Sequence, residues 1–229
     1  MSAAHPLVAV VIPAYNEGRR VADVVRSLPG SLLGVERVVA LVIDDGSSDD
    51  TALAARTAGA TVLRHRVNLG KGAALRTGCE GANRLGADAI VLMDADGQHL
   101  PGDLAGLVGP LFSGEVDVVL GSRRFGRGMP VATRAGNHIL NGLLRALFSI
   151  RVSDSQCGFR AINGAAYPAL RWNAADYAVE TEMLVRIRQA RLRWVEVPIA
   201  TVYHDRYKGT QPLDGLRILR QMLAWRIGA

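Results

Sequence analysis

The pattern of apolar and polar residues between positions 7 and 121 alternates between two kinds of segment. Short apolar runs, rich in β-branched residues, predict strands over residues 7–13, 38–43, 61–63, 89–93 and 116–120. Longer stretches with helical periodicity lie between them and predict helices over residues 19–28, 50–58, 70–85 and 101–112. Strands and helices that alternate in this way form a mostly parallel sheet flanked by helices. The pattern therefore predicts an α/β fold with a Rossmann-like central sheet.

The chain beyond residue 121 follows a different pattern, with amphipathic helices predicted over residues 135–150 and 213–227. One side of each helix is apolar, formed by Ile139, Leu140, Leu143, Leu144, Leu147 and Phe148 in the first and by Leu216, Leu219, Leu223 and Ile227 in the second. Such a side can pack against a protein core. A basic amphipathic helix that carries a tryptophan, here Trp225, can also lie in a membrane interface. The pattern leaves both alternatives open.

A length of 229 residues suits one domain, which we expect to span residues 1–229. The apolar content of 49% indicates a globular protein and excludes disordered and fibrous classes. Two cysteines do not make a disulfide framework. The N-terminus lacks the pattern of a signal peptide, and no apolar run approaches the roughly 18 to 20 residues of a membrane span. We therefore expect a cytoplasmic protein.

The formal net charge of +6 is compatible with nucleic acid, an anionic membrane surface or a polyphosphate ligand. The positions of the polar residues say more than the total charge. Ligands of parallel sheets bind beyond the carboxyl ends of the strands. Polar clusters follow the first four predicted strands at this edge, at residues 16–17, 44–50, 68–72 and 94–99.

The fourth cluster carries two carboxylates one residue apart, Asp94 and Asp96, followed by Gln98. A strand that ends here would place both carboxylates on the same side, because its side chains alternate with a period of two. Two like charges at this spacing repel unless a cation lies between them, and hard oxygen ligands suit Mg²⁺ or Mn²⁺. The sequence thus predicts a metal that carries a phosphate, and the alternative is a solvated turn.

The second and third clusters carry residues that suit the other parts of a nucleotide. Asp44 and Asp45 follow a strongly apolar strand, where a carboxylate can accept hydrogen bonds from a ribose hydroxyl or a base N–H. Lys71 lies between Gly70 and Gly72 at the start of a helix, where backbone N–H groups favour an anion. The P-loop spacing and the Gly-x-Gly-x-x-Gly fingerprint are both absent, which argues against a P-loop ATPase and a nicotinamide dehydrogenase.

Taken together, the four clusters are more specific than any one of them. They read Pro13-Ala14-Tyr15-Asn16-Glu17, Asp44-Asp45-Gly46-Ser47, Asn68-Leu69-Gly70-Lys71-Gly72 and Asp94-Ala95-Asp96-Gly97-Gln98-His99. In order and spacing they resemble the nucleotide-sugar half of family 2 glycosyltransferases with the GT-A fold. Later motifs resemble the dolichyl- and polyprenyl-phosphate sugar synthases of that family: Gly121-Ser122-Arg123, Arg134, Asp154-Ser155-Gln156-Cys157-Gly158-Phe159-Arg160, Glu182-Met183-Leu184 and Glu196-Val197-Pro198-Ile199. The resemblance covers nearly the whole chain, with a donor half over residues 1–121 and an acceptor half with a C-terminal helix over residues 122–229.

This resemblance implies a role for each matching residue. It places the nucleoside diphosphate sugar at Pro13, Tyr15, Glu17, Asp44, Asp45, Lys71, Asp94, Ala95, Asp96, Arg206 and Lys208. It places Mg²⁺ or Mn²⁺ at Asp94, Asp96 and Gln98, and the acceptor phosphate at Arg123 and Arg134. The residues that it implicates in catalysis are Asp96, Arg123, Arg134 and Asp154.

Two motifs of related enzymes do not occur in the sequence. Inverting GT-A enzymes that glycosylate hydroxyl groups commonly carry a Glu-Asp pair with the general base, and this chain has no Glu-Asp dipeptide. It also lacks a Gln-x-x-Arg-Trp motif, which argues against a processive polysaccharide synthase. A phosphate acceptor is already ionised at neutral pH and needs a cationic clamp more than a base. Asp154 is the remaining acid on the acceptor side, and its structural alternative is a pair with Arg160.

We therefore expect an inverting, metal-dependent transfer of mannose or glucose from a GDP- or UDP-sugar to polyprenyl phosphate. The enzyme would lie at the inner face of the membrane and make peripheral contact with anionic lipids. One alternative is the same fold acting on a soluble phosphorylated or small-molecule acceptor. The other is a non-catalytic nucleic-acid-binding module, but the acidic edge of the predicted sheet would repel a phosphate backbone, so we expect no nucleic acid partner.

Overall fold

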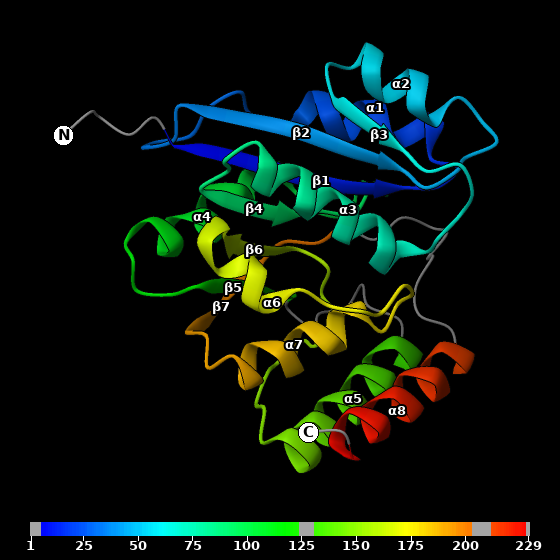
Figure 1. Ribbon diagram of the computed structural model, residues 1–229, viewed down its shortest axis with the longest axis vertical. Coiled ribbons are helices and arrows are strands. Elements are labelled where there is room, and N and C mark those ends of the chain that lie inside the picture. Colours follow the sequence, from blue (N-terminus) through cyan, green and yellow to red (C-terminus); the bar gives the residue numbers. More distant parts are fainter. Residues whose placement is uncertain (1–5, 124–130, 203–211, 228–229) are drawn as a thin grey trace.

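The computed structural model describes residues 6–123, 131–202 and 212–227. In this part of the chain a seven-stranded sheet runs through the molecule in the order β3-β2-β1-β4-β6-β5-β7 (Figure 1). The strands are β1 (Leu7–Ala14), β2 (Arg37–Asp44), β3 (Thr61–Arg64), β4 (Ala89–Leu92), β5 (Val118–Arg123), β6 (Arg160–Asn163) and β7 (Trp194–Ile199). Strand β6 is antiparallel to both of its neighbours, and the other pairs are parallel.

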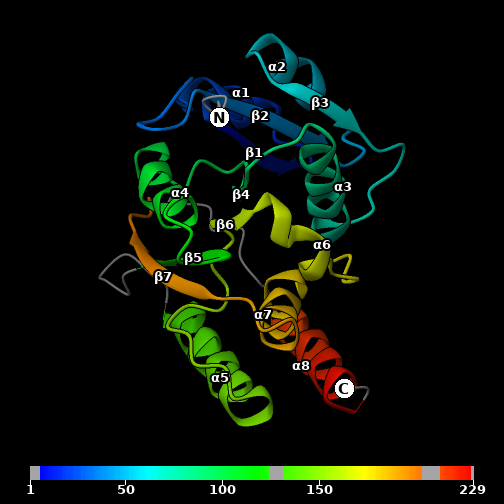
Figure 2. The same cartoon turned by 60° about the vertical axis from the view of Figure 1, so that its left-hand side comes forward.

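Helices cover both faces of this sheet. They are α1 (Gly18–Ser27), α2 (Thr51–Thr57), α3 (Lys71–Arg84), α4 (Leu104–Phe112), α5 (Val131–Phe148), α6 (Tyr167–Leu170), α7 (Val179–Gln189) and α8 (Pro212–Ile227). Short 3₁₀ turns, η1 (Pro101–Asp103) and η2 (Gly164–Ala166), precede α4 and α6. In Figure 2, α4 lies on one side of the strands, and α3, α6 and α7 lie on the other.

The core explains why the strands read as continuous apolar runs. Alternate residues of β1 enter two separate buried clusters, with Leu7, Ala9 and Val11 in one and Val8, Val10 and Ile12 in the other. Helix α3 contributes Ala74, Leu75, Cys79 and Ala82 to the first cluster, and α4 contributes Leu104, Leu107, Val108 and Leu111 to the second. A strand with helices on both faces has no polar side, which is the pattern of a buried parallel sheet.

The elements predicted up to residue 121 are all present, and their bounds agree within a few residues. The prediction of a mostly parallel sheet flanked by helices is confirmed. The sequence prediction did not include β6, β7, α6 or α7. Two of these segments matter for the site, because β6 lies between β4 and β5 and α7 follows the segment that closes one side of the pocket.

The two amphipathic helices, α5 and α8, lie side by side at the end of the molecule opposite β3 (Figure 1). Leu140, Leu144, Ile218 and Met222 from these helices are buried in the first core cluster. On α5 the core-packing alternative is correct for Leu140 and Leu144, which belong to the predicted apolar side. On α8 the buried residues, Ile218 and Met222, are not on the predicted side. Ile139 on α5 and Leu223 on α8 remain exposed, at 63% and 47%. Among the described helices, none has both the length and the apolar content that a bilayer crossing requires.

Candidate active site

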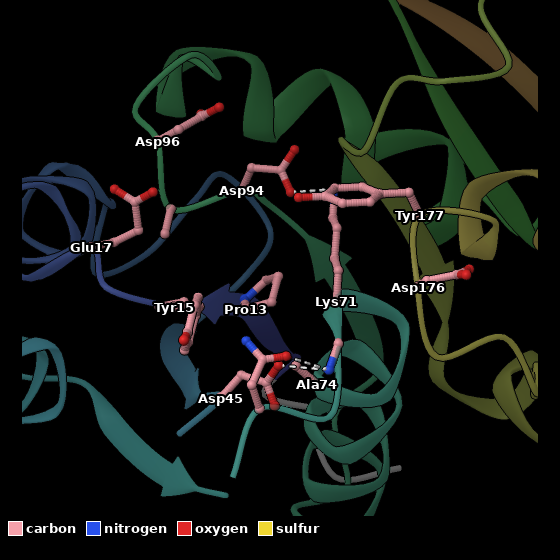
Figure 3. A pocket seen from close by; sticks show the side chains of 14 residues that line it. Pro13, Tyr15, Glu17, Asp45, Lys71, Ala74, Asp94, Asp96, Asp176 and Tyr177 are labelled. Atoms are coloured by element: carbon pink, nitrogen blue, oxygen red, sulfur yellow. Dashed lines mark hydrogen bonds and ion pairs between the residues drawn. The ribbon is translucent and has the colours of Figure 1, made fainter. Parts of the chain in front are cut away.

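A pocket of about 430 Å³ opens at the carboxyl ends of β1, β2 and β4 (Figure 3). It is lined by Pro13, Ala14, Tyr15, Glu17, Asp45, Asn68, Gly70, Lys71, Ala74, Asp94, Ala95, Asp96, Asp176 and Tyr177. Most of the predicted donor-site residues therefore meet in one cavity, although they come from loops far apart in the sequence. The sheet brings them together because its parallel strands end at a common edge.

Asp45 forms one end of the pocket and is fixed by its neighbours. One of its carboxylate oxygens accepts a hydrogen bond from the backbone N–H of Leu69 at 3.0 Å and the other accepts from that of Gly70 at 2.8 Å. The Nδ1 atom of His65 lies 2.7 Å from the same carboxylate, and its Nε2 lies 3.0 Å from the hydroxyl of Thr77 on α3. Tyr15, 47% exposed, lies beside Asp45 in Figure 3. This end offers an aromatic surface next to a preoriented carboxylate.

Asp44, also predicted to hold the nucleoside, lies beneath the loop and is completely buried. Its carboxylate accepts a hydrogen bond from the backbone N–H of Ser47 at 2.9 Å and lies 3.0 Å from Nε of Arg64. In this turn Gly46 has a φ of 75°, and a Cβ there would overlap the backbone of Val67. The structure gives Asp44 contacts that shape the loop, whereas Asp45 faces the pocket.

A chain of three charges occupies the centre of the site. Nζ of Lys71 lies 2.7 Å from a carboxylate oxygen of Asp94 and 2.8 Å from one of Glu180. Burial opposes ionisation of Asp94, but the positive charge of Lys71, aided by that of Arg123, lowers its pKa. Burial also opposes the charge on Lys71, but the two carboxylates raise its pKa, so the lysine stays protonated. Glu180 was not predicted as a site residue, because it lies about 80 residues after the last motif of the donor half.

The Asp96 carboxylate lies in a different setting from that of Asp94. Gln98 donates to it twice, from its backbone N–H at 2.9 Å and from its side-chain amide at 2.8 Å. Burial, together with the negative charge of Asp94, raises the pKa of Asp96. Figure 3 shows Asp94 turned toward Tyr177 and Asp96 on the side of Glu17. The expectation from strand alternation does not apply, because β4 ends at Leu92 and both residues lie in the loop.

The oxygen atoms of Asp94 and Asp96 are nevertheless the kind of ligand that a hard divalent cation prefers. Asp94 and Asp96 line the pocket with carboxylate oxygens, and Gln98, whose side-chain amide donates to Asp96, adds an amide oxygen to the same loop. Besides burial, the negative charge of Asp94 contributes to the raised pKa of Asp96, and a cation between the two carboxylates would offset this repulsion. Among the described residues, no cluster of three or more His, Cys, Asp or Glu side chains is arranged to hold a metal. Any ion here would therefore depend on few protein ligands, as expected where a substrate phosphate completes the coordination.

His99, the last residue of the Asp94–His99 motif, is buried. Its ring stacks on Phe159, with centroids 4.8 Å apart and planes 13° apart. Its Nδ1 accepts a long hydrogen bond, 3.4 Å, from the backbone N–H of Asp94. Burial lowers the pKa of His99, so the ring is neutral at pH 7. The residue supports the loop that carries Asp94.

The start of α3 differs from the sequence prediction in one respect. The backbone N–H groups of Gly72 and Ala73 both point to the carbonyl oxygen of Ala175, at 2.8 and 3.3 Å. These two amides are engaged with the chain itself and are not available to an anion, and the amides of Leu69 and Gly70 just before them donate to the Asp45 carboxylate. Positive charge at this edge of the pocket is supplied by the side chain of Lys71 instead.

Arg123 and Asp154 form a buried pair next to this centre. Nε and Nη2 of Arg123 donate to the two carboxylate oxygens of Asp154, at 2.6 and 2.9 Å. Asn137 on α5 donates to the same carboxylate at 2.8 Å. Arg160 does not pair with Asp154; it is fully buried and donates to the backbone carbonyls of Cys157, Glu180 and Ser155.

The remaining predicted residues lie apart from the pocket or outside the described chain. Arg134 is exposed on the first turns of α5. Arg206 and Lys208, expected to bind the donor, fall outside the described residues. Asp176 and Tyr177 line the pocket and were not predicted, because they belong to an irregular segment with no periodic pattern.

Comparison with known proteins agrees with this geometry. The family model described as glycosyl transferase family 2 matches residues 9–168, which carry all the donor motifs. The chain belongs to glycosyl transferase family 2. The predictions of this family and of a glycosyltransferase are confirmed.

Two relatives of this family 2 enzyme are named for lipid phosphate acceptors. The UDP-N-acetylglucosamine–dolichyl-phosphate N-acetylglucosaminyltransferase of Methanococcus voltae is 30% identical, over 98% of this chain and 98% of that protein. The undecaprenyl-phosphate mannosyltransferase of Micrococcus luteus is 31% identical, over 91% of this chain and 88% of that protein.

A solved structure extends the comparison to the fold. Glucosyl-3-phosphoglycerate synthase from Mycobacterium tuberculosis superposes with a TM-score of 0.76 and 28% identity, over 99% of this chain and 81% of that chain. Another structure of that enzyme contains Mn²⁺, UDP-glucose and phosphoglyceric acid. The GT-A fold expected from the motifs is confirmed for this family 2 glycosyltransferase.

Proposed function

We propose that this family 2 glycosyltransferase transfers a hexose, mannose or glucose, from a GDP- or UDP-sugar to polyprenyl phosphate, with inversion and with Mg²⁺ or Mn²⁺. The observation that carries the proposal is the arrangement of one pocket. An aromatic side chain and a fixed carboxylate, Tyr15 and Asp45, lie at one end, and the Lys71–Asp94 pair with Asp96 lies beyond them. This order matches that of a nucleoside followed by a diphosphate.

The residues present fit each part of such a donor. Tyr15 and Pro13 offer faces on which a base and ribose can pack, and Asp45 can accept a hydrogen bond from a base N–H. Lys71 stays charged and binds phosphate oxygens as a point charge. Asp94, Asp96 and Gln98 would hold the metal, which offsets the negative charge that develops on the leaving diphosphate.

In the reaction, an oxygen of the acceptor phosphate forms a bond to the anomeric carbon as the bond from that carbon to the nucleoside diphosphate breaks. The diphosphate leaves with the bonding electrons. The acceptor is already an anion, so no protein base is required, and Arg123 and Arg134 bind and orient it. Arg123 lies close enough to the centre to lower the pKa of Asp94. Its fixed position beside Asp154 would preorganise one side of the acceptor phosphate site.

Relatives that are named for lipid phosphate acceptors support polyprenyl phosphate as the acceptor. Peripheral contact with anionic lipids would use α5 and α8, which expose Ile139 and Leu223 together with the basic residues Arg134, Arg145, Arg220 and Arg226. Sedimentation with vesicles containing phosphatidylglycerol at low salt tests this contact. Absence of binding to those vesicles would contradict it.

A soluble phosphorylated acceptor is the second candidate. The observation that favours it is the structural similarity to an enzyme solved with phosphoglyceric acid. The two candidates separate in one assay, in which a radiolabelled nucleotide sugar is offered with undecaprenyl phosphate or with 3-phosphoglycerate. Product in the organic phase supports the lipid acceptor, and product confined to the aqueous phase supports the soluble one. Arg134→Ala should raise the KM for the acceptor, while Arg84→Ala, an exposed arginine at the end of α3, should not.

The donor is tested first by calorimetry. GDP and UDP are titrated separately into the protein, with Mn²⁺ or with EDTA. We expect one nucleotide to bind in the presence of Mn²⁺, and Asp96→Ala to abolish this binding. Asp23→Ala, which removes an 81% exposed carboxylate of α1, is the matched control and should bind as the wild type does. If folded wild-type protein binds neither nucleotide with Mn²⁺, the proposed function is wrong.

A further inference from the structure

The segment between α6 and α7, residues 171–178, closes one side of the pocket and is held against α3 by several contacts. The indole N–H of Trp172, a fully buried side chain, donates to the carbonyl of Gly72 at 2.8 Å. In return, the carbonyl of Ala175 accepts from the backbone N–H of Gly72 at 2.8 Å. Segment and helix therefore exchange hydrogen bonds at the same residue.

Two glycines make this close approach possible. A Cβ at Gly70 would overlap the carbonyl of Ala175, and a Cβ at Gly72 would overlap that of Ala174. Because the atoms that such a Cβ would meet belong to the backbone, no side chain could rotate away to make room. The Gly-Lys-Gly sequence thus has two roles. Its lysine lines the pocket, and its glycines allow the backbone of the segment to pack closely against the start of α3.

The opposite side of the segment is fixed by α7. The Glu182 carboxylate, which is buried, accepts hydrogen bonds from the backbone N–H groups of Asn173 at 3.0 Å and Ala174 at 2.6 Å. Arg186, one turn later, donates to Glu182 at 3.0 Å. Asp176 accepts from the backbone N–H of Ala178 at 3.0 Å, which sets the turn into α7. The segment is held in one position from both sides.

This framework directs one side chain into the pocket. Tyr177 is 46% exposed although its neighbours Ala178 and Val179 are buried. In Figure 3 its ring is drawn over the Lys71–Asp94 pair and away from Tyr15 and Asp45, and all of these residues line the same pocket. Asp176 also lines the pocket, but its side chain points away from Asp94 and Lys71 in the same view, so Tyr177 is the residue of the segment that faces this pair.

We propose that Tyr177 contacts the hexosyl group of the donor and determines which sugar the enzyme accepts. The inference rests on the proposed function, which places the nucleoside at Tyr15 and Asp45 and the diphosphate at Lys71 and Asp94. The sugar then lies beyond the diphosphate, where Tyr177 offers an aromatic face to the C–H groups of a pyranose and a hydroxyl to its oxygens. A tyrosine on a rigid segment discriminates between sugars because it cannot adjust to a wrong hydroxyl orientation.

The test compares binding of the free nucleotide with binding of the nucleotide sugar, both with Mn²⁺. The nucleotide is whichever of UDP and GDP the wild type binds, and the sugars are its glucose, mannose and N-acetylglucosamine conjugates as available. For Tyr177→Ala we expect the Kd of the free nucleotide to stay within about twofold and that of the preferred nucleotide sugar to rise about tenfold, the worth of one hydrogen bond with its contact area. Tyr177→Phe removes the hydroxyl and keeps the ring, so it separates their contributions, and it should change the order of affinities for the different nucleotide sugars.

Two control variants show whether the effect is specific to Tyr177. Tyr15→Ala should weaken binding of the free nucleotide and of the nucleotide sugar together. Phe112→Ala, which removes an aromatic side chain 41% exposed on α4, should weaken binding of neither ligand. Circular dichroism confirms that each variant is folded. The inference would be overturned if Tyr177→Ala lost affinity equally for both ligands, lost affinity for neither, or raised only the KM for the acceptor. Failure of the proposed function would appear earlier, as a wild type that binds no nucleotide.

Discussion

Arg123 and Asp154 are joined by two parallel hydrogen bonds, Nε to Oδ2 at 2.6 Å and Nη2 to Oδ1 at 2.9 Å. The backbone N–H of Arg123 donates to the same carboxylate at 3.2 Å. Both side chains are almost entirely removed from solvent, with exposures of 9% and 0%. Asp154 therefore fixes the position of the Arg123 guanidinium and balances its charge.

Removal of Asp154 leaves the guanidinium buried without its main counter-charge. We expect Asp154→Ala to lower the free energy of unfolding by about 3 to 5 kcal/mol, as broken buried ion pairs do. Urea denaturation measures this loss. The exposed pair of Arg26 and Asp23 on α1 provides the control, since Asp23→Ala should cost at most about 1 kcal/mol. Equal and small losses in both variants would contradict a structural role for Asp154.

Lys71 has a structural and a binding role that can be separated. Lys71→Met leaves Asp94 and Glu180 without their shared cation, so we expect a loss of stability of about 3 kcal/mol and nucleotide binding at least about tenfold weaker. Adding Glu180→Gln to Lys71→Met removes one of the two stranded charges. The double variant should recover part of the stability, measured by urea denaturation, without recovering nucleotide affinity. Recovery of both together would show that Lys71 does not contact the nucleotide.

Gly72 is expected to tolerate no side chain. A Cβ at this position would overlap the Ala174 carbonyl, so Gly72→Ala should destabilise the protein by about 1 to 3 kcal/mol, as overpacking does. Gly142→Ala on α5 meets nothing within 4 Å and should stabilise by about 0.5 to 1 kcal/mol, the helix preference of alanine over glycine. Thermal unfolding of the two variants measures the contrast. A neutral Gly72→Ala would mean that the segment can move away from α3.

The ion pair that joins the starts of β5 and β7 should give a measurable pH dependence. Hydrogen bonds from Arg193 lower the pKa of Asp117 below its ordinary value of 3.8. The folded protein then binds this proton less readily than the unfolded chain, so the stability that Asp117 adds is present above pH 3.8 and is lost as the pH falls through its folded-state pKa. Asp117→Asn should be slightly less stable at neutral pH and should lose less stability on acidification.

Urea midpoints between pH 7 and about pH 3 test this prediction, and Asp23→Asn, a carboxylate 81% exposed, is the control. A steeper acid loss in Asp117→Asn than in the wild type would show that the pair does not stabilise the fold.

The sequence predicted the donor half well because each strand there is buried on both faces and ends in a polar loop. Asp45, Lys71, Asp94 and Asp96 could be placed at one edge from strand order alone, since parallel strands share that edge. Asp44 shows the limit of this reasoning. Adjacent residues point in opposite directions, and the strand pattern does not say which of Asp44 and Asp45 is buried.

The acceptor half was harder to predict because several of its buried positions are polar or charged. Strand β6 is four residues long and begins with Arg160, a buried arginine held by backbone carbonyls. Helix α7 buries both Glu180 and Glu182, so its charged residues do not mark a solvent face. Strand β7 gave a usable signal, because Val195, Val197 and Ile199 alternate with polar residues and proline. Tyr177 could not be found from periodicity, because tertiary contacts alone fix its segment.

The position of β6 has a consequence for how the polypeptide is assembled during synthesis. This strand, made from residues 160–163, is inserted between β4 and β5, which the ribosome completes much earlier. Until it arrives, β4 and β5 have no strand between them, and the loop that carries Asp94 lacks the Phe159 ring on which His99 stacks. The nascent chain can pair β1, β2, β3 and β4 early, but the loop that carries Asp94 gains its support from Phe159 only after residues 159–163 have emerged.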